Sequence, residues 1–460
     1  MLFKEKVFQS FCLKRPVAVM SQLVLNRLLD GEMVDQIFEE KAEQQYHRRL
    51  LFSSMTKLLS SVVMSKSPSV NAAYKKMKDE MSVSLTALYR KLDRVEPVLT
   101  QALVRHSYQQ VIEVGRAIGG IGRNDIPGYR TLVFDGNWLS GTEHRLKETR
   151  DSTAAPLPGK SVVVLDPRFK AIKDYFPLED GYSQELSVLD ELLKTVRRND
   201  LWVGDRNFCT LKTMYTMDAK GAAFVIRLHE KIQNGELIGK RKCVGRSKTG
   251  LVYEQKMKLP AYEGRQLIVR RIEIELDQPT RKKDSTVVIL TNLPEEDADA
   301  VKISEVYRGR WSIETAFQSL TVSLNCEINT LCYPKAALFT FALALVAYNA
   351  MAVIQTAVAA AKGRDQANEL SSYYVALEIA ETTDGMLIAV PPDKWQIAST
   401  LTTEKLATHL LEIADNVDME VYRKSKRGPK KKKPPRKNNR DSVHVSSARI
   451  LAERMQKNAC

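Results

Sequence analysis

The chain has 460 residues, which is enough for a sizeable core and for two or three domains. Hydrophobic residues make up 44% and charged residues 27%, as in an ordinary globular protein, so composition alone indicates no function. The six cysteines are scattered, with no C-x-x-C pair and no His at zinc spacing, which argues against structural zinc and for a reduced, cytoplasmic protein. Lys14 and Arg15 interrupt the first apolar stretch too early for a signal peptide.

Positive charge is concentrated near the C-terminus. Residues 423–440 carry eleven Lys or Arg and no acid, out of a formal net charge of +15. The run is broken by Pro434 and Pro435 and cannot bury apolar surface, so residues 421–460 are predicted to form a basic, disordered tail. Nucleic acid is the expected partner, because each neutralised phosphate releases counterions, and the densest contacts are expected from Lys430, Lys431, Lys432 and Lys433. A purely solvated run, or a contact with an anionic membrane, is the alternative.

Residues 1–115 lack strand-like alternation and are predicted to form a helical N-terminal domain, with one helix over residues 23–38. Within this domain, residues 71–81 and 85–95 resemble a helix-turn-helix motif, in which the second helix would contact DNA. On that interpretation Arg90 and Lys91 face the DNA. Ordinary packing of two short helices in a bundle is the alternative.

The pattern changes at Tyr129 to short β-rich runs, separated in places by amphipathic helical stretches, which is typical of an α/β fold. Residues 231–293 alternate polar and apolar positions and contain Gly turns, so they are predicted to be β-rich. Helical periodicity then resumes, and residues 362–420 are predicted to form a C-terminal helical region. Residues 336–361 carry no charge, and we expect a buried core helix there, with a membrane-spanning helix as the alternative.

Two aspartates follow apolar strands of this α/β region. Asp135 comes after the run 131–134, and Asp205 comes after the run 201–204. The carboxyl ends of strands are where α/β sheets place their ligand chemistry. A single Asp after a strand is more often a turn former or a helix cap, so neither residue alone indicates a site.

A third acid, Glu314, stands in the segment YRGRWSIETAFQSL. A spacing of 100° per residue puts it on one polar helical stripe with Tyr307, Arg310 and Thr321, while another stripe is apolar and can pack on a sheet. The alternative is a surface helix with an internal ion pair between Arg310 and Glu314. Three carboxylates in this setting suit divalent cations with oxygen ligands. They predict phosphodiester chemistry at Mg²⁺, or Mn²⁺, in a site for two ions.

These segments resemble the IS4-type insertion-sequence transposases, whose catalytic DDE domain is RNase H-like. The resemblance covers about residues 125–350 and rests on DGNWLSGTEHR at Asp135, LPGKSVVVLDP at Leu157, LWVGDRNFCT at Leu201, AAFVIRLH at Ala222 and YRGRWSIE at Tyr307. It implies an RNase H-like catalytic domain over residues 125–361, with the β-rich segment 231–293 as an insertion. It also implies that Asp135, Asp205 and Glu314 are the catalytic, metal-holding residues, and that Tyr307 and Arg310 contact DNA phosphate near the cut.

The resemblance further implies cut-and-paste transposition, in which strands are cleaved at transposon ends and joined to target DNA. A homodimer would bring two ends together in the cytoplasm, at the nucleoid. One position departs from the family signature Y-(2)-R-(3)-E-(6)-K, because Thr321 stands where the signature has Lys. A phosphate-contacting charge is therefore missing there.

Two other functional classes stay open on the sequence alone. The first is a catalytically inactive or domesticated, transposase-derived DNA-binding protein, which the uncharged Thr321 favours and the three acids disfavour. The second is a membrane protein with a basic cytosolic tail, which requires residues 336–361 to span a bilayer.

Overall fold

The structure is a computed structural model that describes residues 5–44, 49–139, 146–149, 156–232, 235–280, 283–395, 397–425, 428 and 445–459. Helices make up the part before the first strand: α1 (Lys6–Lys14), α2 (Pro16–Leu28), α3 (Gly31–Lys41), α4 (Phe52–Val63), α5 (Val70–Lys76), the 3₁₀ turn η2 (Lys78–Glu80), α6 (Leu85–Leu92) and α7 (Pro97–Ile118). The prediction of one helix over residues 23–38 is wrong. The chain breaks between α2 and α3 because Asp30 caps α3, its side chain accepting the N–H of Met33.

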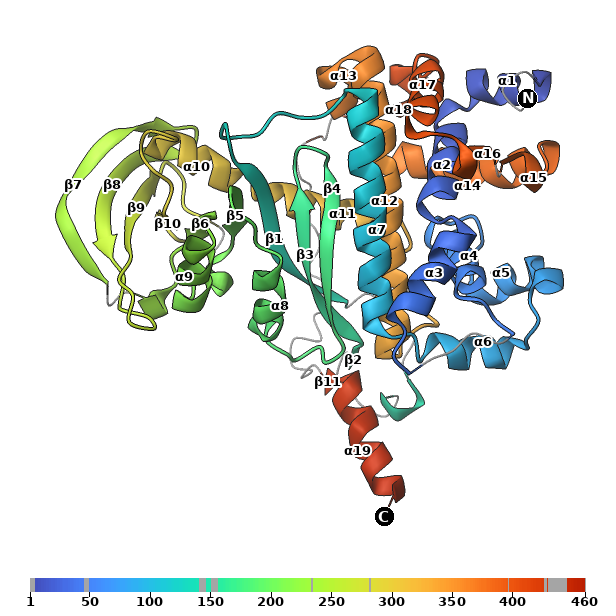
Figure 1. Ribbon diagram of the computed structural model, residues 1–460, viewed down its shortest axis with the longest axis horizontal. Coiled ribbons are helices and arrows are strands. Elements are labelled where there is room, and N and C mark those ends of the chain that lie inside the picture. The colour runs from blue at the N-terminus through green and yellow to red at the C-terminus, as the bar shows by residue number, and fades with distance from the viewer. Residues whose placement is uncertain are drawn as a thin grey trace.

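A nine-stranded sheet extends from the middle of the molecule, at β3 and β4, to its left-hand end, at β7 (Figure 1). Its strands are β1 (Arg130–Leu139), β3 (Gly159–Asp166), β4 (Ala171–Leu178), β5 (Asp200–Gly204), β6 (Ala223–Arg227), β7 (Glu236–Ser247), β8 (Gly250–Lys258), β9 (Ile268–Leu276) and β10 (Thr286–Thr291). Their spatial order is β4-β3-β1-β5-β6-β10-β9-β8-β7. β1, β5 and β6 run parallel, and the other neighbouring pairs are antiparallel. The α/β class expected from the sequence is confirmed.

Helices cover both faces of the central strands. β3 and β5 are buried along their whole length, as expected for apolar strands between two layers. One face packs on α8 (Leu189–Lys194) and α9 (Leu211–Ala219) through a cluster that includes Trp202 and Phe224. The other face shares one hydrophobic core with the N-terminal helices and with α10 (Ala300–Arg308), α11 (Trp311–Ser323) and α12 (Pro334–Lys362). The sheet and the N-terminal helices therefore depend on the same core.

β7 forms the outer edge of the sheet, within the segment expected to be β-rich. None of its twelve residues is buried. Its pairing with β8 shifts register twice, between Ile238 and Lys242 and again between Cys243 and Gly245. One face of this part of the sheet is covered in part by α10, which contacts β7, β8 and β9.

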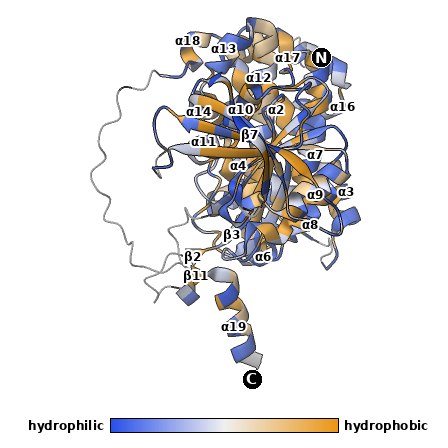
Figure 2. Cartoon of the chain, turned by 90° about the vertical axis from the view of Figure 1, so that its left-hand side faces the viewer, coloured by the Kyte–Doolittle hydropathy of each residue, from blue (hydrophilic) through white to orange (hydrophobic). Residues whose placement is uncertain are grey.

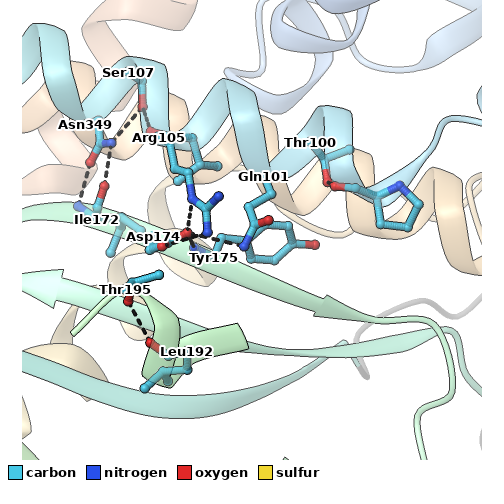
Figure 3. A network of polar contacts seen from close by, with 12 residues as sticks. Thr100, Gln101, Arg105, Ser107, Ile172, Asp174, Tyr175, Leu192, Thr195 and Asn349 are labelled. Atoms are coloured by element: carbon cyan, nitrogen blue, oxygen red, sulfur yellow. Dashed lines mark hydrogen bonds and ion pairs between the residues drawn. The ribbon is translucent and has the colours of Figure 1, made fainter. Parts of the chain in front are cut away.

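α12 is a core helix in this structure. Among the described residues it is the one helix long and apolar enough to cross a membrane, and 89% of its most apolar window is buried inside the protein. Its Asn349 is fully buried, accepts the N–H of Ile172 at 2.7 Å, and donates to the Ile172 carbonyl at 3.0 Å and to the Ser107 hydroxyl at 2.8 Å (Figure 3). Beside it, Arg105 of α7 donates twice to Asp174 of β4, at 2.8 and 3.1 Å. These bonds fasten α12 and α7 to the sheet at one place.

After α12 the chain continues as α13 (Arg364–Asn368), α14 (Ser372–Ala389), α15 (Pro392–Trp395), α16 (Ile397–Thr400), α17 (Thr403–Ala414) and α18 (Met419–Tyr422). The prediction of a disordered tail over residues 421–460 is wrong for residues 421 and 422, which belong to α18, and wrong again for residues 445–459. There β11 (Val445–Ser446) pairs with β2 (Pro156–Leu157), and α19 (Ser447–Ala459) extends away from the body of the protein (Figure 2). Asp180 anchors this segment because it accepts hydrogen bonds from Ser446 and Arg449.

Candidate active site

Asp135 and Asp205 lie next to each other on neighbouring parallel strands. β1 and β5 pair in register up to Phe134 and Gly204, and each aspartate is the next residue along the chain. Neighbouring strands lie about 4.8 Å apart, so the two aspartates lie close together, where the paired stretch of these two inner strands ends. Gly204 makes this close pairing possible, because a β-carbon there would lie only 2.6 Å from the ring of Phe134.

The strand that carries Asp135 is longer than the sequence indicates. The prediction that Asp135 ends the strand is wrong, since β1 continues to Leu139 and pairs with β3 as far as Gly159. What ends at Phe134 is the continuous run of buried residues, and the next four residues are partly or fully exposed before the buried Leu139. The apolar run therefore marks where burial stops, while hydrogen bonding to β3 carries the strand onward. Asp205, in contrast, directly follows the last residue of β5, as expected.

Glu314 comes from α11, which packs on the sheet through its buried residues Ile313, Ala316 and Leu320. The single helix expected to carry both Tyr307 and Glu314 is two helices, α10 and α11. The amide of Arg310 bonds to the carbonyl of Tyr307, and the amide of Ile313 bonds to that of Arg310, so the backbone tightens into 3₁₀ turns at the junction. Arg310 lies at this junction, directly before α11.

Arg310 joins two of the three acids. Its Nη1 lies 2.7 Å from Oδ2 of Asp135, and its Nη2 lies 2.8 Å from Oε1 of Glu314. The guanidinium also lies about 6 Å from the rings of Tyr307 and Trp311. Its side chain is only 10% exposed, and its Nε is buried without a hydrogen-bond partner among the described residues. Three of the residues expected to act together, Asp135, Tyr307 and Glu314, thus surround one buried cation, and Asp205 follows the strand that pairs with the one carrying Asp135.

The surroundings change the acidity of two side chains in this cluster. The pKa of Asp135 is raised to about 6, chiefly by burial and also by the nearby charges of Asp205 and Glu185, which together outweigh the lowering effects of Arg310 and the Gly136 amide. Burial likewise raises the pKa of Tyr307 to about 12, so this residue is a neutral phenol at physiological pH. The cluster therefore holds closely spaced negative charges that require a cation for balance.

In this structure Arg310 supplies the balancing charge. Among the described residues, no three His, Cys, Asp or Glu side chains are gathered closely enough to hold a metal ion. The ion pairs give the reason, because the guanidinium occupies the space between the carboxylates of Asp135 and Glu314. The oxygen atoms themselves are of the kind that Mg²⁺ and Mn²⁺ prefer.

Comparison with known protein families decides what kind of domain holds this cluster. Residues 128–350 match the model of the transposase DDE domain. These residues form a transposase DDE domain. The matched segment includes Asp135, Asp205 and Glu314, together with the whole nine-stranded sheet. The resemblance inferred from the sequence is therefore confirmed at the level of the DDE transposases.

One solved structure similar to this chain is described as the cryo-EM structure of a piggyBac transposase synaptic complex with hairpin DNA. It shares 12% sequence identity, with a TM-score of 0.39, over 88% of this chain and 86% of that one. No curated protein matches the sequence.

At Thr321 the DDE domain has no charge to offer. Its side chain is exposed on α11, and its hydroxyl donates back to the carbonyls of Phe317 and Gln318 in the same helix, at 3.2 and 3.1 Å. The position is therefore accessible to a ligand, but its polar group is already used within the helix.

The other basic residues singled out from the sequence lie outside the acidic cluster. Arg90 and Lys91 are on α6, where Arg90 is exposed. Lys91 is half-buried, with its ammonium 5.4 Å from the centre of the Phe38 ring, and burial lowers its pKa. Lys430, Lys431, Lys432 and Lys433 lie outside the described residues.

A pocket next to Asp205 was not anticipated from the sequence. It opens at the ends of β6 and β10, and the residues that line it include Arg206, Arg227, His229 and Asp284. Arg227 pairs with Asp284 at 2.8 Å, and its charge also acts on Tyr307. The pocket forms because the chain after β6 and the turn before β10 meet in space, and no local pattern in the sequence marks that meeting.

Proposed function

We propose that the chain is a DNA transposase that cleaves strands at transposon ends and transfers them into target DNA, with Asp135, Asp205 and Glu314 as catalytic residues. The observation that carries this proposal is the geometry of the triad. Two aspartates follow paired residues of adjacent strands, and Glu314 is joined to one of them through Arg310. The match to the transposase DDE domain supports the proposal.

We propose an RNase H-like architecture for the catalytic domain, over residues 125–361, and membership of the IS4 type. The strand order β4-β3-β1-β5-β6 supports the architecture. In it β3 runs antiparallel to β1, while β5 and β6 run parallel to β1. On this proposal residues 231–293 are an insertion that extends the sheet by the strands β7 to β10. The insertion precedes α11, the helix that carries Glu314.

The three carboxylates are proposed to hold Mg²⁺ or Mn²⁺, as two ions. These ligands suit such ions, because they are all carboxylate oxygens and the side chains of Asp135 and Glu314 are partly exposed. Glu314 is 40% exposed, so its side chain can leave the guanidinium without unpacking α11. When bound, such ions activate the attacking oxygen of a phosphodiester reaction and stabilise the leaving one. Arg310 and Tyr307 are proposed to bind the DNA phosphate beside the cut, since a guanidinium matches phosphate with two parallel hydrogen bonds.

DNA is the proposed partner for the rest of the chain as well. Residues 1–115 are proposed to be a DNA-binding domain that uses Arg90 and Lys91, and residues 362–420 a helical region. Lys430 to Lys433 would add affinity that is independent of sequence. A homodimer is proposed to hold two transposon ends, in the cytoplasm at the nucleoid.

The test is strand cleavage by the purified full-length chain, with Mg²⁺ and DNA that carries the ends of its own element. We expect cleavage by the wild type and none by Asp205→Ala. The matched control is Asp218→Ala, which removes an aspartate of α9 that pairs with Arg265 at 3.1 Å. No cleavage by the wild type, or undiminished cleavage by Asp205→Ala, would contradict the catalytic proposal.

A second candidate function is specific DNA binding without catalysis. It is favoured by Thr321, which offers no charge at the signature position, and by the guanidinium between Asp135 and Glu314. The same experiment separates the two functions. Retention of the end DNA by the wild type, with no metal-dependent product, supports binding alone.

A further inference from the structure

A fourth carboxylate, that of Glu185, lies beside the triad. It comes from the face of the sheet that packs on α8 and α9, whereas α11 packs on the opposite face. Glu185 opens the 3₁₀ turn η4 (Glu185–Val188), which contacts β3 and the turn η5 (Arg206–Phe208) that directly follows Asp205. Its side chain is only 12% exposed. Its charge acts on Asp135. Glu185 is thus close to both strand ends without being part of either.

Glu185 touches the strand end of Asp135 through a glycine. A β-carbon built at Gly136 would overlap the carboxylate of Glu185, with Oε1 as its nearest atom. The carboxylate therefore fills the space that any side chain at position 136 would need. Because Gly136 is the residue after Asp135, the position of Glu185 restricts where the Asp135 backbone can lie.

Glu185 touches the other strand end through an amide. Nδ2 of Asn207 donates to Oε2 of Glu185 at 3.4 Å, and Asn207 is two residues after Asp205. The two oxygens of one carboxylate thus face the two chain segments that carry the aspartates. The third contact is Lys160 of β3, whose Nζ lies 3.3 Å from Oε1 of Glu185 and donates to the carbonyl of Ser183 at 3.3 Å.

Stability alone does not account for this arrangement. A buried ion pair contributes little net stability, because desolvation of both charges offsets their attraction. Glu254 and Arg270 form a comparable pair, with side chains 17% and 9% exposed against 12% and 8% for Glu185 and Lys160. That pair lies on β8 and β9, and its arginine holds the chain before α10. Only the Glu185 pair of these two contacts the strand ends of the triad.

We propose that Glu185 is a positioning residue that sets the spacing of Asp135 and Asp205 by bearing on Gly136 and holding Asn207. The inference rests on the proposed function, because the spacing matters for the divalent ion that the two aspartates would share. Lys160 pairs with the Glu185 carboxylate and holds it in place. Residues behind metal ligands of this kind change metal affinity by about 10- to 100-fold when they are replaced.

The experiment measures binding of Mn²⁺ alone to the full-length chain by electron paramagnetic resonance of the free ion. We expect Glu185→Gln to weaken binding by about tenfold, and the double variant Glu185→Gln/Lys160→Gln, which leaves no unpaired buried charge, to weaken it equally. The matched control Glu254→Gln should bind as the wild type does. Circular dichroism of each variant checks that it is folded.

A second pair of variants tests the spacing itself. Gly136→Ala should weaken Mn²⁺ binding, because its methyl group displaces the carboxylate. Adding Glu185→Asp, whose shorter side chain makes room for that methyl group, should restore part of the affinity. A purely structural role for Glu185 would make the double variant worse than either single one, and that result would overturn the proposal.

The outcomes also separate this inference from the function on which it rests. If Asp205→Ala loses Mn²⁺ binding while both Glu185→Gln variants bind as the wild type does, Glu185 has no positioning role and the proposed function stands. If the wild type binds no more Mn²⁺ than Asp205→Ala, the proposed metal site is wrong, and the inference is overturned with it.

Discussion

Replacing Asn349 by Leu should destabilise the protein although the new side chain is more hydrophobic. The change removes three hydrogen bonds, two to the backbone of Ile172 and one to Ser107. The hydroxyl of Ser107 keeps its bond to the Val104 carbonyl, so two buried backbone groups of β4 lose their partner. Each costs about 1–3 kcal/mol, and burial of the larger apolar side chain returns about 1–2 kcal/mol. At the middle of these ranges about 4 kcal/mol is lost and about 1.5 kcal/mol is returned, so the net loss in the free energy of unfolding is about 2–3 kcal/mol.

Equilibrium unfolding in urea, followed by circular dichroism, measures this loss. Thr340→Val is the matched control, because Thr340 is also fully buried in α12 but its hydroxyl donates to the Ala336 carbonyl of its own helix. We expect its unfolding midpoint to stay within a small fraction of the shift caused by Asn349→Leu. Equal stability of Asn349→Leu and the wild type would refute the view that α12 is fastened to β4 and α7 through this amide.

Three further predictions concern charge. Thr321→Lys adds an exposed cation to α11, so the affinity for short duplex DNA should rise. The slope of log K against log salt concentration should steepen by about 0.9. An unchanged slope would mean that residue 321 does not contact the DNA phosphates. Replacing the nine cations of residues 426–440 by Ser, with the length kept, should lower non-specific DNA affinity and flatten the same slope, and a constant slope would show that this stretch is idle. Arg310→Met removes the cation that neutralises Asp135 and Glu314, so Mn²⁺ should bind about tenfold more tightly in the absence of DNA, and DNA affinity should fall. Weaker Mn²⁺ binding would contradict the view that the guanidinium competes with the metal ion for these two carboxylates.

The local chemistry of the triad can be predicted from the sequence. An apolar run followed by Asp is visible at both Asp135 and Asp205. The parallel pairing of β1 with β5 then brings these two aspartates close together. The amphipathic stripe before and after Glu314 likewise indicates a helix packed on a sheet. These features are local, and for that reason one sequence is enough to find them.

The features that the sequence did not disclose depend on contacts between distant segments. The break between α10 and α11 follows from the tightened backbone at Gly309, where periodicity alone predicts a continuous helix. No motif or spacing marks Glu185, because its partners Lys160 and Asn207 come from other elements. The ordered segment 445–459 was missed for the same reason, since its charges look solvated until Asp180 and β2 are seen beside them.

The outer edge of the sheet limits how two copies of this protein can meet. An edge strand exposes unpaired N–H and C=O groups on which another strand can build. Along β7 the two register shifts make that row of groups uneven, and Lys240 and Lys242 place positive charge beside it. Two such edges repel each other, and their hydrogen-bonding groups do not align. The sheet of one molecule is thus prevented from continuing through β7 into the sheet of another.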